Sequence, residues 1–139
     1  MNSCYLETKT NNYLIMKKCI FCNKKKHKIV YNNRYFYVLR DTFPVTKNHT
    51  LIIPKKHMTS FFDLNNTEII SLFDVLKKQR IFLTNKDKTI KSFNIGINNG
   101  KYAGQTIMHL HVHLIPRRKG DVKNPRGGVR GVIPSKQKY

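Results

Sequence analysis

The chain has 139 residues, of which 40% are hydrophobic, and it carries a formal net charge of +20. This length fits one compact domain, and the apolar content excludes a chain that is disordered throughout. No apolar run approaches the roughly 18–20 residues that a membrane-spanning helix needs, so we expect a cytoplasmic protein with no membrane partner. The charge predicts affinity for nucleotides or nucleic acid, but Lys and Asn are abundant throughout, so charge alone does not separate the two.

The first part of the chain is polar, and we expect a flexible extension over residues 1–15. A Cys-x-x-Cys turn follows at Cys19 and Cys22. Without a secretory signal, this spacing indicates a metal or redox pair in a reducing compartment rather than a disulfide framework. Two β-rich runs at residues 29–31 and 35–39 then predict a hairpin, because the two Asn residues between them tolerate the positive φ that such a turn needs.

One main helix is predicted over residues 66–83, with Asn66 as its N-cap. Strands are predicted before and after it, at residues 50–53, 93–98 and 107–115, the last closed by Pro116. The apolar residues of the helix recur near helical spacing: Ile69, Ile70, Leu72, Phe73, Leu76, Ile81 and Phe82. This order of elements predicts an α+β fold, an antiparallel β-meander sheet packed with one main helix.

The segment His109-Leu-His111-Val-His113-Leu-Ile is the most informative one. Side chains alternate between the two faces of a strand, so the three His share one face while the Leu and Val residues share the other. A metal-binding or merely polar sheet face is the alternative interpretation of one such His. Three in alternation predict a functional face, because imidazole can attack phosphorus or transfer a proton near neutral pH.

Residues 104–117, Gly-Gln-Thr-Ile-Met-His-Leu-His-Val-His-Leu-Ile-Pro-Arg, resemble the signature of the histidine-triad (HIT) family. A second matching block runs from Asp41 to His57, and the Cys-x-x-Cys turn is a third. The resemblance implies a HIT-like fold over residues 16–120, followed by a basic tail, residues 121–139, that packs on or near the active site. It also implies a homodimer.

The resemblance assigns roles residue by residue. His111 is implied to be the nucleophile on a nucleotide α-phosphate, with its ring oriented by the main-chain carbonyl of His109. His113 and Gln105 are the other implied catalytic residues. The residues implied to bind substrate are Asp41 at the ribose, and Asn98 and Thr106 at the phosphate. Turn formation is the alternative interpretation of Asp41 and of Asn98.

The same resemblance implies a structural zinc ion and no organic cofactor. Its ligands would be Cys19, Cys22, His49 and His109, two thiolates and two imidazoles in a closed tetrahedral site. Two alternatives stay open. His49 is a catalytic relay residue in branches without the Cys pair, and His27 is a rival ligand.

The motif that runs on into Pro-Arg and Gly120-Asp121 favours the branch of the family that hydrolyses dinucleoside polyphosphates. The partner is therefore expected to be a purine nucleotide or a dinucleoside polyphosphate. The alternative activity is that of a purine nucleoside phosphoramidase. An alternative of another class is a nucleotide or nucleic-acid binding module that uses the Lys-rich surface, and nucleic acid is the less favoured partner.

Overall fold

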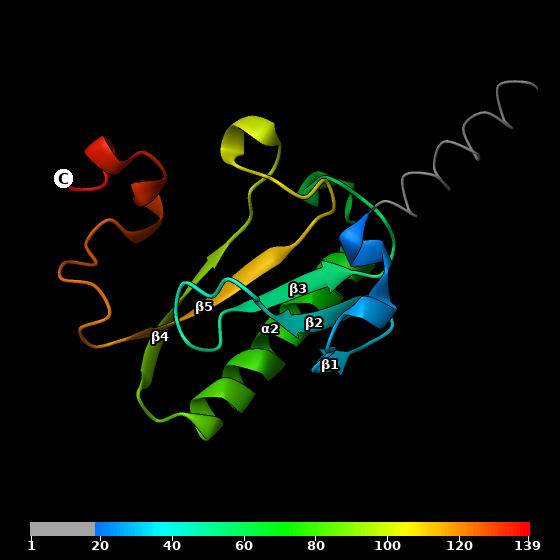
Figure 1. Cartoon of the computed structure of the whole chain (residues 1–139), viewed down its shortest axis with the longest axis horizontal. Coiled ribbons are helices and arrows are strands. Elements are labelled where there is room, and N and C mark those ends of the chain that lie inside the picture. The colour runs from blue at the N-terminus through cyan, green and yellow to red at the C-terminus, as the bar shows by residue number, and fades with distance from the viewer. Residues whose placement is uncertain (1–18) are drawn as a thin grey trace, which may run out of the picture.

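The computed structural model describes residues 19–139 and contains a five-stranded antiparallel sheet and one long helix (Figure 1). The predicted extension over residues 1–15 and Cys4 lie outside the described residues. The strands and the helix are β1 Tyr31–Asn32, β2 Phe36–Arg40, β3 Thr50–Pro54, α2 Asn66–Lys86, β4 Ile90–Gly96 and β5 Val112–Arg118. The α+β class with one main helix is thus confirmed. The strand order is β1-β2-β3-β5-β4, so β5 lies between β3 and β4 and the sheet departs from a simple meander.

The predicted hairpin is formed by β1 and β2, with Tyr31 opposite Val38. Its turn does not use a positive φ, since Asn48 is the single described non-Gly residue with one. Instead the Asn33 side-chain oxygen accepts hydrogen bonds from the backbone N–H groups of Tyr35 and Phe36, at 2.9 and 2.8 Å. The Asn therefore acts through its side chain, as in an Asx-turn.

Helix α2 begins at Asn66, the residue predicted as its cap, so the true cap lies one residue earlier. Asn65, and not Asn66, is the N-cap: its side chain accepts from the Glu68 N–H while the Glu68 carboxylate accepts from the Asn65 N–H, both at 2.9 Å. This capping box leaves no role for Asn66 as a cap, and that prediction was wrong.

Helix α2 buries one face and exposes another that is also apolar. The buried face packs Leu72 and Val75 against Phe36, Val38, Ile52 and Val112 of the sheet. Most of the apolar residues that predicted the helix point the other way and are exposed: Ile69, Ile70, Phe73, Ile81 and Phe82. No partner chain tests the homodimer, which stays a prediction.

The opposite face of the sheet is covered by the Cys knuckle, residues 19–28, which forms two short 3-10 turns, Ile20–Cys22 and Lys24–Lys26. Phe21 of the knuckle is buried against Tyr37, Leu39, Leu51 and Ile53. Because Leu51 is paired with His113, the histidine segment lies on this same face. The knuckle and α2 therefore sandwich the middle of the sheet (Figure 1).

Strand β5 begins at Val112, five residues later than predicted. His109 and His111 precede it, and between them the Leu110 N–H donates to the Met58 carbonyl at 2.7 Å instead of to the sheet. The prediction of one continuous strand over residues 107–115 was therefore wrong at its start. The departure frees the His109 carbonyl from the sheet ladder.

The tail, residues 121–139, forms two further 3-10 turns, Gly128–Val132 and Pro134–Lys136, of which the first lies beside β4. Gly127 has a φ of 81°, and a Cβ there would collide with the Gln137 carbonyl oxygen, so only glycine fits. In Figure 1 the tail and the Cys knuckle lie at opposite ends of the sheet. Within the described part of the chain, no helix is long and apolar enough to cross a membrane.

Candidate functional site

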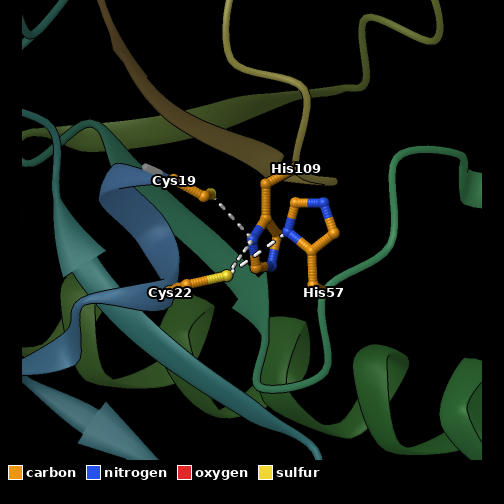
Figure 2. A group of neighbouring side chains, drawn as sticks. All are labelled: Cys19, Cys22, His57 and His109. Atoms are coloured by element: carbon orange, nitrogen blue, oxygen red, sulfur yellow. Dashed lines mark hydrogen bonds between the residues drawn. The ribbon is translucent and has the colours of Figure 1, made fainter. Parts of the chain in front are cut away.

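Four metal-ligating side chains meet beneath the Cys knuckle: Cys19, Cys22, His57 and His109 (Figure 2). Their ligand atoms all lie within 4.8 Å of one another. The first 3-10 turn brings the two thiols together, since the Cys22 N–H donates to the Cys19 carbonyl at 3.1 Å. His57 comes from the loop after β3, and His109 from the segment before β5. This cluster joins three segments that are distant in the sequence.

The structure replaces His49 by His57 in the predicted ligand set. His49 lies instead beside His113 and Asp41. The physical reason is the strand register: Leu51 pairs with His113, so His49 lies toward the far end of β5 while His57 lies beside its beginning. The rival ligand His27 is also outside the cluster, because its Nε2–H donates to the Ile20 carbonyl at 2.7 Å.

The spacing of the donor atoms fits a tetrahedral zinc ion. The Sγ atoms of Cys19 and Cys22 lie 3.4 and 3.6 Å from His109 Nδ1, and Cys22 Sγ lies 3.3 Å from His57 Nδ1. Zn–S and Zn–N bonds of about 2.3 and 2.0–2.1 Å at tetrahedral angles place sulfur and nitrogen about 3.6 Å apart.

Hydrogen bonding and burial also suit His109 to the role of a ligand. Its Nε2–H donates to the Pro54 carbonyl at 2.9 Å, which leaves Nδ1 as the unprotonated nitrogen turned toward the thiols. Burial lowers the pKa of His109 to about 4, so the ring is neutral at pH 7. Burial and the neighbouring Cys19 raise the pKa of the Cys22 thiol to about 11. A bound cation would stabilise the thiolate and so lower this pKa again.

His111 has its tautomer set by the backbone. Its Nδ1 lies 2.8 Å from the His109 carbonyl oxygen, and because a carbonyl can only accept, Nδ1 carries the proton. Nε2 is therefore the nitrogen with a free lone pair. The ring is 7% exposed and packs edge-on to Phe21, with centroids 5.4 Å apart. An imidazole whose orientation is fixed in this way is suited to nucleophilic attack through Nε2.

His113 has its tautomer set by a chain of side chains. The Val45 N–H donates to His49 Nδ1 at 3.3 Å, so Nε2 of His49 carries its proton and donates to His113 Nδ1 at 2.9 Å. His113 consequently keeps its own proton on Nε2. Burial, together with His111 and His49, lowers the pKa of His113 to about 4, so this neutral donor persists at pH 7. Asp41 Oδ2 lies 3.4 Å from His49 Nδ1 and is in place to stabilise His49 if it becomes protonated.

His111 opens onto a pocket of about 300 Å³, the His111 pocket. Two predicted substrate-binding residues, Asp41 and Thr106, line it. Its other walls are largely apolar and come from the knuckle, the sheet and two loops: Ile20, Phe21, His27, Leu39, Arg40, Thr42, Phe43, Leu51, Ile107 and His113. A largely apolar cleft lined by a carboxylate and two imidazoles has the character of a small-molecule site.

Gln105 and Asn98 do not reach this pocket in the structure. The Gln105 oxygen accepts from the Gly100 N–H at 2.8 Å, and its Nε2 donates to the carbonyls of Thr59 and Ile107 at 2.9 and 3.2 Å. Gln105 therefore holds the loop that precedes the histidines, and its catalytic role stays a prediction. Asn98 donates to the Gly104 carbonyl at 3.4 Å and lines a different cavity.

Two residues outside the predicted ligand, catalytic and substrate-binding sets belong to the site, of which His57 was noted only as a weak candidate for substrate contact. His57 completes the thiol cluster, and its signal was its place just after a buried strand that ends in Pro54. Phe21 lies between Cys19 and Cys22, and its ring contacts those of both His109 and His111, at centroid distances of 5.9 and 5.4 Å. It therefore connects the Cys–His cluster to His111.

Comparison with known proteins adds to this geometry. The HIT domain model matches residues 23–120. An uncharacterized HIT-like protein of Methanocaldococcus jannaschii is 36% identical over 107 residues, 74% of this chain and 81% of the relative. A HIT family protein from Bacillus anthracis has a TM-score of 0.69 at 35% identity, over 75% of this chain and 76% of that one. A Zn-bound histidine triad family protein from Mycobacterium smegmatis has a TM-score of 0.66 at 33% identity, over 76% and 79%.

Two relatives have named activities, and both act on nucleotides. An asymmetrical bis(5'-nucleosyl)-tetraphosphatase of Schizosaccharomyces pombe is 38% identical over 78 residues, 56% of this chain and 42% of the relative. An adenosine 5'-monophosphoramidase of Saccharomyces cerevisiae is 33% identical over 104 residues, 72% of this chain and 63% of the relative. The matching proteins therefore include nucleotide hydrolases with different leaving groups.

Proposed function

Because this chain belongs to the HIT domain family, we propose that it is a nucleotidyl hydrolase or transferase that uses His111 to attack the α-phosphate of a dinucleoside polyphosphate. The observation that carries the proposal is the 2.8 Å hydrogen bond between His111 Nδ1 and the His109 carbonyl. This bond selects the tautomer in which Nδ1 carries the proton and Nε2 the lone pair, on a ring that lines the His111 pocket. Such a nitrogen needs no separate base before it attacks phosphorus.

The proposed reaction has two steps. In the first, a bond forms between His111 Nε2 and the α-phosphorus, and the bond from that phosphorus to the bridging oxygen breaks, with its electron pair leaving on the oxygen. In the second, water attacks the nucleotidyl-histidine, the P–N bond breaks, and a mononucleotide is released. The Nε2–H of His113 is suited to stabilise the developing charge on the phosphate oxygens.

The residues of the His111 pocket suggest how the nucleotide binds. Asp41 sits at the rim with its carboxylate available to ribose hydroxyls, although one oxygen also accepts from the Phe43 N–H at 2.9 Å. Thr106 is exposed beside His111, where its hydroxyl is suited to a phosphate oxygen. The apolar walls from the knuckle and β2 would enclose the base.

We also propose that Cys19, Cys22, His57 and His109 hold a structural zinc ion. Two thiols and two imidazoles form a closed donor set, with no position left for substrate, so the ion would supply cross-linking and no chemistry. It would fix the Cys knuckle over the sheet and, through His109, the carbonyl that orients His111. The zinc-bound relative supports this proposal.

The proposed function is tested by turnover of two substrates that share an adenylyl group. Purified protein is incubated with diadenosine tetraphosphate and, separately, with adenosine 5'-phosphoramidate, and AMP release is measured. A higher kcat/KM on the tetraphosphate is expected. Faster cleavage of the phosphoramidate would instead assign the chain to the phosphoramidase activity. Turnover of neither, together with salt-sensitive binding to RNA, would indicate a nucleic-acid binding module.

Replacing His49 by alanine is expected to raise the pKa of His113 from about 4 toward its ordinary value of 6.5. The variant removes the charge of one neighbouring imidazole and opens part of the buried surface to water, and both changes favour the protonated form. The pKa is read from the His113 ring proton resonances in an NMR titration. We expect kcat to fall by about 10²-fold in the same variant, because the proton on His113 loses its fixed position.

The pKa of His113 also sets how the stability of the wild-type protein depends on pH. The pKa of His113 lies below 6.5 in the folded protein, so its contribution to stability is complete above pH 6.5 and is lost as the pH falls toward 4. Wild-type His113 titrating near pH 6.5, or a pKa that does not move in His49→Ala, would contradict the proposed chain from Val45 through His49. Asp41→Asn is the contrasting variant: it keeps His49 and removes a carboxylate whose charge raises the pKa of His113, so this pKa should fall and not rise.

A further inference from the structure

A cavity of about 590 Å³ lies on the other side of His113 from the His111 pocket. We call it the tail cavity, because the first 3-10 turn of the tail forms one wall, opposite β4, β5 and the loop before β3. It is lined by Val45, Thr46, His49, Asn94, Ile95, Gly96, Ile97, Asn98, His113, Ile115, Arg117, Asp121, Val122, Gly128, Val129 and Val132. Its lining includes His49 and also His113, which lines the His111 pocket as well. The cavity therefore begins where the proposed reaction takes place.

The walls of the tail cavity are mainly apolar. Val45 faces it from one side and Ile97 from another, while the tail contributes Val129 and Val132. These last two side chains remain 63% and 76% exposed, although the turn that carries them lies against β4. Apolar side chains kept at the edge of a cavity gain free energy when a planar apolar group covers them.

The outer end of the tail cavity is positively charged. A second hollow of about 620 Å³ shares Asn94, Arg117, Asp121, Val122 and Gly128 with it and is also lined by Arg118, Lys119 and Lys123. Two of these cations are paired, Arg117 with Asp121 and Arg118 with Asp87, both at 2.8 Å. Lys119 and Lys123 have no acidic partner among the described residues, so the mouth attracts anionic ligands.

We propose that the tail cavity binds the leaving nucleoside of a dinucleoside polyphosphate, while the His111 pocket binds the nucleotide that is attacked. This inference rests on the proposed function, and it names the residues that would bind a large leaving group. The two spaces share only His113, which would then contact the phosphate between the two nucleosides. The volume is within the range of about 300–1,000 Å³ for small-molecule sites.

The test compares Val132→Asp with Ile133→Asp. Both residues are exposed apolar side chains of the tail, but only Val132 lines the cavity. For each variant, kcat/KM is measured on diadenosine tetraphosphate and on adenosine 5'-phosphoramidate, whose leaving group is ammonia. A charged side chain in the apolar wall is expected to lower the ratio of the two values by about tenfold or more, and Ile133→Asp is expected to leave this ratio unchanged.

A second variant, Gly127→Ala, disrupts the tail turn through the collision with Gln137 and should lower the same ratio. Unchanged ratios in Val132→Asp and Gly127→Ala would overturn the inference, whereas the proposed function would stand if the wild type still turns over. If the wild type cleaves neither substrate, the proposed function fails and the inference is decided by calorimetry. Tighter binding of diadenosine tetraphosphate than of AMP, lost in Val132→Asp, supports it, and equal affinities overturn it.

Discussion

Replacing His111 by alanine is expected to lower kcat on every nucleotide substrate by about 10⁴-fold or more, because it removes the proposed nucleophile. His113→Ala should cost less, about 10²-fold, since His113 contributes one hydrogen-bond donor and not the nucleophile. The measurement is AMP release under saturating substrate. Because His111 is buried against Phe21, the thermal transition of each variant is recorded to separate lost chemistry from lost folding.

The same prediction has a chemical readout. Wild-type protein mixed with substrate labelled at the α-phosphate and quenched in alkali should retain label on the chain, and acid should release it, as expected of a P–N bond. His111→Ala should retain none. Retention of label by the variant, or its turnover within tenfold of the wild type, would show that another group attacks phosphorus.

Replacing Cys22 by alanine is expected to remove bound zinc and to lower the melting temperature by more than about 10 °C. The cluster joins the knuckle, the loop after β3 and the segment before β5, so losing it releases three segments at once. Activity should fall as well, because Phe21 lies between the two Cys residues in the sequence and its ring packs on that of His111. Zinc content by mass spectrometry and a thermal scan are measured together.

His27→Ala is the matched control for this variant, because it removes a neighbouring imidazole that lies outside the cluster. It should keep its zinc and melt within about 2 °C of the wild type. Treatment of the wild type with a chelator should reproduce the lower melting temperature and leave Cys22→Ala unchanged. A full complement of zinc in Cys22→Ala, or wild-type stability after chelation, would contradict the proposed metal site.

The sequence was informative where local chemistry decides the outcome. The Asn pair between two β-rich runs predicted the first hairpin. The alternation around His111 predicted that the imidazoles share a face, and the rings of His111 and His113 do lie 5.1 Å apart, although His109 and His111 precede β5. Even the acceptor for the His111 ring, the His109 carbonyl, was implied by the motif and is observed at 2.8 Å. These features depend on residues within a few positions of each other.

The metal ligands could not be assigned in the same way because they depend on strand register. His49 and His57 lie on either side of one short strand, and both are possible partners for the Cys pair in a sequence. The pairing of Leu51 with His113 decides between them, and this long-range register has no local signal.

The helix illustrates a second limit. Ile70, Phe73 and Ile81 were among the apolar residues that predicted the helix, but they are exposed, while Leu72, Val75 and Leu83 are buried. When a helix has two apolar faces, the spacing of its apolar residues does not decide which face is buried. Only packing against β2, β3 and β5 selects the buried face.

The hydrogen bond that orients His111 comes from the main chain, and this has a consequence for mutational tolerance. In a site where a carboxylate orients the imidazole, substitution of the residue that carries the carboxylate can also disable the nucleophile. Here no side-chain change can delete the acceptor, since every residue at position 109 carries a carbonyl. A saturation screen should therefore find His111 intolerant of all replacements, whereas substitutions at His109 should inactivate through loss of a proposed zinc ligand and the backbone shift that follows, and not through loss of the acceptor.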